Sequence, residues 1–305
     1  MNARREFPFV QVDVFTDRIF GGNPLAVFPY AEGLTQAQMQ AVAKEMNLSE
    51  TTFVLPPTRP DCAARVRIFT PARELQFAGH PTVGTSYVLA THGLLSDGAV
   101  EIVLEEGVGP VPVRFEGDPR EPRFIWMTHP EATFGPPVEN RAAIAAALGV
   151  DEGELIEDAP IQVGSTGSAF LYVPLRHKKS VDKAQLNVPL LLQAFNSPTA
   201  VGVFIFAPGP NPSAGRVYSR MFAPHTSGIP EDPATGSASG PLGVYLLKHG
   251  LVTGRTDTRI VSEQGTRMGR QSFVHINVRH NGSSPAEIEV GGSVVPVLEG
   301  VLRLP

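Results

Sequence analysis

Two widely separated stretches of this sequence resemble each other. The segment from Phe69 to Leu95 matches the segment from Phe222 to Val252. Each copy begins with Phe-x-Pro, passes through a turn of small residues and ends in an apolar stretch that closes on His-Gly-Leu. Self-similarity of this kind is typical of one structural unit built twice, and 305 residues are enough for two domains. The sequence therefore predicts two similar lobes.

The matched turns are candidate binding elements. Counting back from the closing His-Gly-Leu of each copy sets Gly79 opposite Gly236 and His80 opposite Ser237. Each turn precedes a predicted helix, whose free NH groups and positive dipole end can hold a carboxylate. The structural alternative is that the glycines only shape strand-to-helix turns. Because a polar residue follows the glycine in both copies, we interpret Gly79, Gly236 and Ser237 as substrate-binding residues.

The copies differ at a residue suited to proton transfer. Upstream, the run ETTFVLP, which begins at Glu50, is aligned with GSAFLYVP, which begins at Gly167, so only the first lobe supplies a carboxylate there. A partly desolvated carboxylate has a raised pKa and can take a proton in one position and return it in another. The alternative is an exposed carboxylate at the end of a helix. We predict that Glu50 is a catalytic acid/base.

His80 and Asp232 are the other candidate catalytic residues. The imidazole of His80, at the mouth of a predicted helix, can donate to a substrate oxygen or shuttle a proton. Asp232 falls in a longer approach to the second turn and has no counterpart in the alignment. Its carboxylate can orient a substrate amine or the histidine. Structural alternatives are a packed histidine and a turn or capping aspartate.

Local patterns place Glu50 between a helix and a strand. Thr35 and Gln38 form a capping-box pattern, and the apolar periodicity after them predicts a helix that ends near Asn47. The run 51–55 is typical of a strand. The 30 glycines and 29 prolines of the chain favour many short strands joined by tight turns.

Composition argues against several partners. A net charge of −5, with no basic run longer than two residues, as at Lys178 and Lys179, predicts that neither nucleic acid nor a membrane surface is bound. No apolar run approaches the roughly 18 residues of a membrane span, and no secretory signal pattern opens the chain. We therefore expect a cytoplasmic protein.

Motifs for metals and nucleotide cofactors are absent from the sequence. A single cysteine, Cys62, excludes an intrachain disulfide and a cysteine-based zinc cluster. The eight histidines show no H-x-x-x-H or H-E-x-x-H spacing, and neither a G-x-G-x-x-G fingerprint nor a P-loop occurs. We expect no metal and no cofactor. A hydrolase triad of Ser237, His80 and Asp232 stays a minor option, because no G-x-S-x-G elbow surrounds the serine.

Four motifs together resemble the PhzF-like isomerase family of phenazine biosynthesis, which shares its fold with diaminopimelate epimerase. They are the opening VDVFTDRIFGGNPLAVF, the segment MNLSETTFV with Glu50, the segment FTPARELQFAGHPTVGT with His80, and EDPATGSASG with Asp232 and Ser237. The resemblance covers nearly the whole chain.

The resemblance implies an α+β fold of two pseudo-symmetric lobes, each a mixed sheet wrapped around a central helix. We expect residues 1–120 to form the first lobe and residues 121–292 the second, with the last strand, near 293–305, returning to the first. It also implies a homodimer, no cofactor, and an active site in the cleft between the lobes.

By motif, the resemblance makes Glu50 the general acid/base. His80, Asp232 and Ser237 would hold and polarise the substrate, and Gly79 and Gly236 would supply backbone NH groups. In the best-known branch of the family the substrate is a dihydro-hydroxyanthranilate, in which a proton moves between ring carbons. The predicted function is therefore a cofactor-independent isomerase acting on a small cyclic or unsaturated amino or hydroxy acid.

The epimerase relatives use a cysteine from each lobe, and this chain departs from that pattern. Ala78 and Thr235 stand at the corresponding positions, and Cys62 lies outside both turns. A two-thiol racemase is excluded, and a single carboxylate suits a proton shift on one face of the substrate. The alternative from another class is a non-catalytic protein that retains the pocket for binding small anions or acts as a scaffold.

Overall fold

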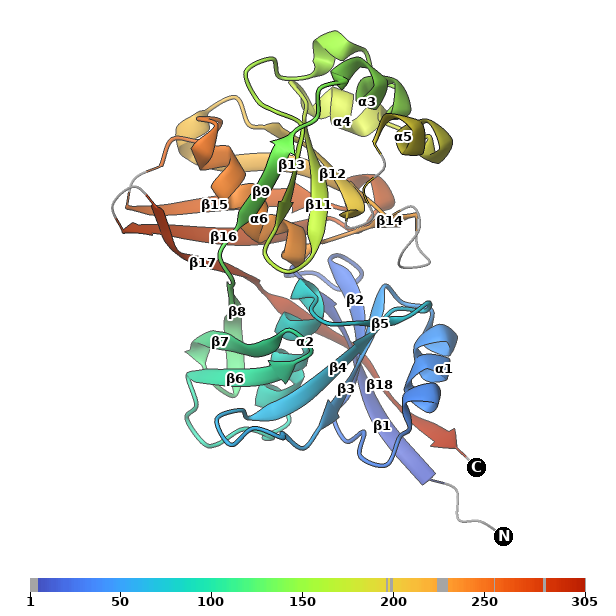
Figure 1. Cartoon of the computed structure of the whole chain (residues 1–305). Helices are drawn as coiled ribbons and strands as arrows, with labels where there is room; N and C mark the ends of the chain where they lie inside the picture. Colours follow the sequence, from blue (N-terminus) through green and yellow to red (C-terminus); the bar gives the residue numbers. More distant parts are fainter. Residues whose placement is uncertain are drawn as a thin grey trace. The chain divides into compact units, whose positions relative to one another are not determined.

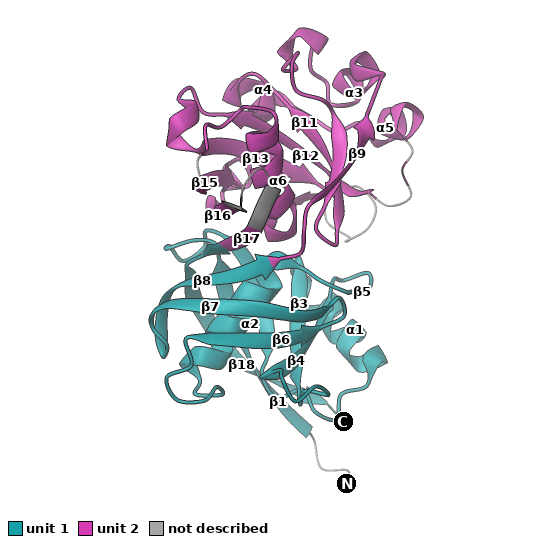
Figure 2. Ribbon diagram, turned by 60° about the vertical axis from the view of Figure 1, so that its left-hand side comes forward, with its two compact units in different colours: residues 1–128, 291–305 teal, residues 129–290 magenta. Residues whose placement is uncertain are grey.

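The computed structural model describes residues 5–195, 197, 200–223, 230–254, 256–281 and 284–304. The chain divides into two compact units (Figure 2). Unit 1 contains residues 1–128 and 291–305, and unit 2 contains residues 129–290. Within the described residues, no helix has both the length and the apolar character needed to cross a membrane.

Unit 1 is a mixed sheet around a central helix. Its elements are β1 (Arg5–Val14), β2 (Asn23–Phe28), α1 (Gln36–Met46), β3 (Glu50–Leu55), β4 (Ala64–Phe69), β5 (Glu74–Leu75), α2 (Gly79–Thr91), β6 (Glu101–Glu106), β7 (Gly109–Asp118), β8 (Glu121–His129) and β18 (Val294–Leu304). The last strand, β18, runs antiparallel along β1, and β1 pairs with β2. Strands β2 and β3 are parallel. The strands wrap around α2, which is buried on nearly every side (Figure 2).

Unit 2 has the same plan with a larger outer layer (Figure 1). Its elements are β9 (Thr133–Pro137), α3 (Arg141–Ala147), β10 (Gln162–Ser165), β11 (Ala169–Pro174), α4 (Lys178–Lys183), α5 (Val188–Ala194), β12 (Ala200–Pro208), β13 (Arg216–Phe222), β14 (Glu231–Asp232), α6 (Gly236–Lys248), β15 (Asp257–Gln264), β16 (Ser272–Asn281) and β17 (Ser284–Gly292). Three short 3-10 segments lie at Glu152–Glu154, Pro212–Ala214 and Thr266–Met268. The predicted α+β class is confirmed.

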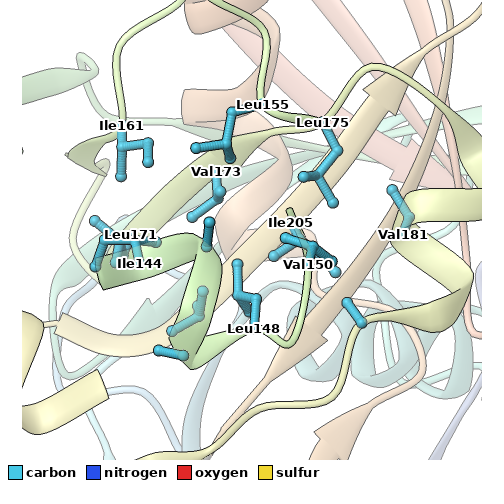
Figure 3. Close-up of a cluster of buried hydrophobic side chains, with 14 of the residues drawn as sticks. Ile144, Leu148, Val150, Leu155, Ile161, Leu171, Val173, Leu175, Val181 and Ile205 are labelled. Atoms are coloured by element: carbon cyan, nitrogen blue, oxygen red, sulfur yellow. The ribbon is translucent and has the colours of Figure 1, made fainter. Parts of the chain in front are cut away.

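The inner strands are buried on both faces, which explains their nearly continuous apolar sequences. On β11, Leu171 and Val173 pack into the aliphatic cluster beside α3 and α4 (Figure 3). Tyr172 points to the opposite face, where its hydroxyl donates to the Ala238 carbonyl of α6 at 2.6 Å. Alternate side chains of one strand thus serve the outer layer and the central helix.

The start of α1 agrees with the predicted pattern. Thr35 is the N-cap, its hydroxyl accepts from the Gln38 backbone NH, and the Gln38 side chain accepts from the Thr35 backbone NH. The helix ends at the C-cap Asn47, which has a left-handed φ of 51°. Glu50 then opens β3, as predicted for a residue at a helix-to-strand junction.

The two units share strand order and direction. The series β1, β2, β3, β4, β5, α2, β6, β7 corresponds to β10, β11, β12, β13, β14, α6, β15, β16. In each series the first two strands are antiparallel, the second pairs in parallel with the third, and the third is antiparallel to the fourth. The fourth strand is antiparallel to the short fifth strand and parallel to the strand after the helix.

This topology shows that the predicted alignment of Glu50 with Gly167 is wrong. The run that begins at Glu50 forms β3, whose equivalent is β12, whereas GSAFLYVP lies mainly in β11, the equivalent of β2. Short apolar strands resemble one another in sequence, and only their pairing partners distinguish them.

Strand register gives the correct counterpart of Glu50. Thr51, the residue after Glu50, faces Phe69 across β3 and β4. In the same way, Val203, the residue after Gly202, faces Phe222 across β12 and β13. Since the repeat equates the two phenylalanines, Gly202 matches Glu50. The matching position is still a glycine, so the carboxylate is present in one unit only.

Asp232 does have a counterpart, contrary to the alignment. Leu75 faces Ile68 across β4 and β5, and Asp232 faces Met221 across β13 and β14. Leu75 and Asp232 also lie at the same distance in sequence from the first residue of the following helix. The additional residues of the second copy come before β14, and residues 224–229 of that approach lie outside the described part of the chain.

Gly84 allows α2 to approach the sheet closely. A Cβ atom at this position would lie 2.6 Å from Leu25 Cδ2 and 2.8 Å from Val14 Cγ2. We expect Gly84→Ala to lower the free energy of unfolding by about 1–2 kcal/mol, because overpacking outweighs the better helix propensity of alanine. Chemical denaturation measures this change.

The control is Gly153→Ala, because a Cβ at Gly153 meets nothing within 4 Å. It should change stability by less than about 0.5 kcal/mol. Equal stability of the two variants would contradict close packing at Gly84.

Candidate active site

Glu50 and His80 come together in unit 1. Glu50 is the first residue of β3, and His80 is the second residue of α2. His80 Nε2 lies 3.3 Å from Glu50 Oε2, and the two side chains are only 4% and 13% exposed. The carboxylate and the imidazole therefore interact where water has little access.

Asn23 holds the other side of the imidazole. Its amide nitrogen lies 3.1 Å from His80 Nδ1, and its side chain is fully buried at the start of β2. The preceding Gly22 has a φ of +60°, and a Cβ there would lie 2.3 Å from the Val14 carbonyl oxygen. Only glycine fits this turn, which positions the Asn23 side chain beside His80.

Burial lowers the pKa of His80 to about 3, so the ring is neutral near pH 7. With the Asn23 amide NH donating to Nδ1, the ring proton resides on Nε2, the nitrogen that lies 3.3 Å from Glu50 Oε2. The pair is thus a close contact between a neutral imidazole and a carboxylate, without hydrogen-bond geometry. A neutral ring places no full positive charge beside the carboxylate, and this preserves more of its basicity than an imidazolium would.

The first turn of α2 presents backbone NH groups beside this pair. Its N-cap, Ala78, has an extended backbone and provides no side-chain cap. Gly79 and His80 are the first two residues of this 13-residue helix, and both are buried. The positive end of the helix dipole and NH groups that no side chain caps can bind an anionic oxygen.

The equivalent turn of unit 2 is built around Asp232. The hydroxyl of Thr235, the N-cap of α6, donates to Asp232 Oδ2 at 2.6 Å. Gln264 Nε2 donates to the Asp232 carbonyl at 2.8 Å and to Thr235 Oγ1 at 3.0 Å, and Gln264 Oε1 accepts from the Thr235 backbone NH at 3.1 Å. This network fixes the buried Asp232 carboxylate relative to the start of α6.

Gly236 and Ser237 open α6 as Gly79 and His80 open α2. Both are buried, and Ser237 is 7% exposed. The N-cap Thr235 directs its hydroxyl to Asp232 and does not cap the helix. The first NH groups of α6 are therefore presented in the same way as those of α2.

The predicted site residues divide between the units. Unit 1 brings together Glu50, Gly79 and His80, and unit 2 brings together Asp232, Gly236 and Ser237. Within unit 1, His80 lies against Asn23 and Glu50, and within unit 2, Asp232 accepts from Thr235, so the contacts inside each unit give the hydrolase triad of Ser237, His80 and Asp232 no support.

Two residues of these networks were missed by the sequence analysis. Asn23 stands in the segment GGNP, where an asparagine at the start of an apolar strand sequence is the available signal. Gln264 ends an ordinary strand sequence and has no local signal at all. Within the described residues, no group of three or more His, Cys, Asp or Glu side chains is placed to hold a metal ion.

A groove of about 1010 Å³ in unit 2 contains none of the predicted site residues. The basic pair found in the sequence lines it, together with Tyr218 and Glu263. Lys178 Nζ lies 3.2 Å from Glu263 Oε1 and 4.0 Å from the centre of the Tyr218 ring. Glu263 thus neutralises the charge of Lys178 locally.

Comparison with known proteins identifies the family. The family model described as phenazine biosynthesis-like protein (PhzC-PhzF) matches residues 12–300. An uncharacterized isomerase of Clostridium acetobutylicum is 34% identical over 303 residues, which cover 98% of this chain and 99% of that protein. The trans-2,3-dihydro-3-hydroxyanthranilate isomerase of Pseudomonas aeruginosa is 35% identical over 296 residues, with 96% and 98% covered.

A solved structure agrees over the same length. The crystal structure of a PhzF-family phenazine biosynthesis protein from Bacillus anthracis matches with a TM-score of 0.86 at 26% identity, and covers 98% of this chain and 100% of that one. The chain belongs to the phenazine biosynthesis-like (PhzC-PhzF) family and is an isomerase.

Proposed function

We propose that this isomerase moves a proton between two carbons of a small cyclic or unsaturated amino or hydroxy acid, without a cofactor, and that Glu50 is the general acid/base. The proposed substrate class is that of the dihydro-hydroxyanthranilates. The observation that carries the proposal is the buried contact of 3.3 Å between Glu50 and the neutral His80 at the start of α2.

A single carboxylate can complete such a reaction. Glu50 accepts a proton from one carbon of the substrate and returns it to another carbon of the same conjugated system, so that no net proton is gained or lost. His80 lies against Oε2 at 3.3 Å, and this contact restricts the orientation of the carboxylate.

The residues at the two positions where the epimerases carry cysteines support a one-base reaction. The N-caps of α2 and α6 are Ala78 and Thr235, neither of which can act as a thiol base. Cys62 lies before β4, and burial raises the pKa of its thiol. Proton removal and return by one carboxylate occur on the same face of the substrate, which gives isomerisation without inversion.

Substrate binding is assigned to the two helix starts. We assign the NH group at Gly79 in unit 1, and the NH group at Gly236 with the Ser237 hydroxyl in unit 2, each to binding anionic oxygens of a substrate, because helix N-termini favour anions. Asp232, held by Thr235, is assigned to orienting a substrate amine or hydroxyl. The Pseudomonas relatives named trans-2,3-dihydro-3-hydroxyanthranilate isomerase, at 34% and 35% identity, motivate the choice of substrate class.

Glu50→Gln should abolish carbon-acid exchange. The amide is nearly isosteric with the carboxylate but cannot accept the proton, so the rate should fall by about 100- to 10,000-fold. We would incubate the protein in deuterated water with small cyclic amino and hydroxy acids, including trans-2,3-dihydro-3-hydroxyanthranilate, and measure deuterium uptake at carbon by NMR.

Glu45→Gln is the matched control, since Glu45 is an exposed carboxylate on α1 and should leave exchange unchanged. Full exchange in Glu50→Gln would refute the assignment of the base. A compound that binds without exchange in the wild-type protein would favour the non-catalytic binding protein.

His80 should stay neutral from pH 8 down to pH 5. Its pKa is lowered to about 3 by burial, whereas a free histidine titrates near 6.5. The ¹⁵N shifts of the ring, measured by long-range ¹H–¹⁵N NMR, should keep the Nε2–H tautomer throughout this range. A midpoint near 6.5 would mean an ion pair with Glu50 and would contradict a neutral imidazole.

A further inference from the structure

A buried carboxyl group lies beneath the helix that carries His80. Glu106 is the last residue of β6 and is 5% exposed. Its Oε1 lies 2.6 Å from Thr82 Oγ1, and the same hydroxyl lies 2.8 Å from the carbonyl oxygen of Ala78. Thr82 stands two residues after His80, and Ala78 is the N-cap of α2. Glu106 therefore reaches the turn that presents His80 and the first NH groups of the helix.

The position of Glu106 corresponds to that of Gln264 in unit 2. Ala64 and Val217 each lie five residues before the phenylalanine that the repeat equates. Ala64 on β4 faces Leu104 on β6, and Val217 on β13 faces Ser262 on β15. Glu106 and Gln264 both follow two residues later, each as the last residue of its strand. Gln264 binds the N-cap turn of α6, and Glu106 binds the first turns of α2. Both units thus use a side chain at this place to hold the start of the central helix.

The protonation state of Glu106 decides how the hydroxyl of Thr82 is used. Burial raises the pKa of Glu106 to about 8, although the Thr82 hydrogen bond opposes the shift. A protonated carboxyl donates to Thr82 Oγ1, so the single hydroxyl proton of Thr82 is available to the Ala78 carbonyl. An ionised carboxylate would instead require that proton and withdraw it from Ala78.

The titratable groups on the surrounding elements have other partners. Glu105, the neighbour of Glu106 on β6, points to the other face of the strand and accepts from Thr58 and from the Arg59 backbone NH. His80 on α2 is engaged by Asn23 and Glu50. The residues of β7 that share the buried face are Val111, Val113 and Phe115, which are apolar.

We propose that Glu106 is a positioning residue, whose protonated carboxyl acts through Thr82 to hold the first turn of α2 and thereby places His80 and the NH group of Gly79. The inference rests on the proposed function of this turn. Ionisation of Glu106 releases the Ala78 carbonyl from the Thr82 hydroxyl and loosens the turn, so activity should decline as the pH rises through the pKa of this group.

Glu106→Gln tests the proposal, because its amide can donate to Thr82 at every pH. The wild-type protein should lose turnover with a midpoint near pH 8, and the variant should not. Glu105→Gln, on the same strand, is the matched control and should keep the wild-type pH profile. A decline that persists unchanged in Glu106→Gln would overturn the proposal.

Two measurements remain informative even if no substrate is found. The amide shift of Gly79 should titrate near pH 8 in the wild-type protein and in Glu105→Gln but not in Glu106→Gln. Thr82→Val, which keeps the shape but removes the hydroxyl, should also abolish this titration. An unchanged titration in Thr82→Val would refute the link through Thr82, whereas failure of the proposed isomerisation alone would leave these shifts intact.

Stability provides a further check with a defined sign. Between pH 4.5 and 8 the folded protein keeps the Glu106 proton and the unfolded chain does not, so stability falls as the pH rises. From pH 6 to pH 8 the folding equilibrium constant of the wild-type protein should fall about 50-fold relative to that of Glu106→Gln. Parallel pH dependences of the two proteins would contradict a buried protonated carboxyl.

Discussion

Both units depend on burying a helix that has no polar face. Helix α2 is buried along nearly all of its length, and so is α6. Such a helix can enter a sheet only where its residues are small: Gly84 meets Leu25, and Gly243 leaves room for Ile276. The close approach brings each helix start, with NH groups that have no partner within the helix, into the interior of a unit, where water cannot satisfy them as readily.

This burial imposes a requirement on the surrounding strands. Polar groups that are removed from water must find hydrogen-bond partners, and here the ends of neighbouring strands supply them. Asn23 forms a hydrogen bond with the imidazole on α2, Glu106 forms one with Thr82, and Gln264 forms one with the N-cap of α6. The hydrogen bonds that offset the cost of burying these polar groups also orient the residues of the candidate site. The same contacts therefore contribute both to stability and to the positioning of the site residues.

The two units share a structural ion pair but differ in the residues at the candidate functional positions. A bidentate arginine–glutamate pair joins the fourth and fifth strands of each unit, Arg67 with Glu74 and Arg220 with Glu231. At the candidate functional positions the copies diverge: glycine replaces Glu50, leucine stands where unit 2 has Asp232, and glutamate stands where unit 2 has Gln264. Each unit thus keeps an equivalent helix start, and the candidate base is present in unit 1.

The sequence alone determined what depends on neighbours along the chain: the capping box at Thr35, the helices after Gly79 and Gly236, the duplication itself, and Glu50 and His80 as candidate residues. The homodimer and the cytoplasmic location stay predictions. Tertiary structure decided what depends on pairing between distant strands. Register corrected the counterparts of Glu50 and Asp232, and it revealed Asn23, Gln264 and Glu106, whose roles come from the turns they face. The sequence of a strand indicates that the strand is buried. Its partner strands are set by hydrogen bonds across the sheet, and no local sequence pattern encodes that pairing.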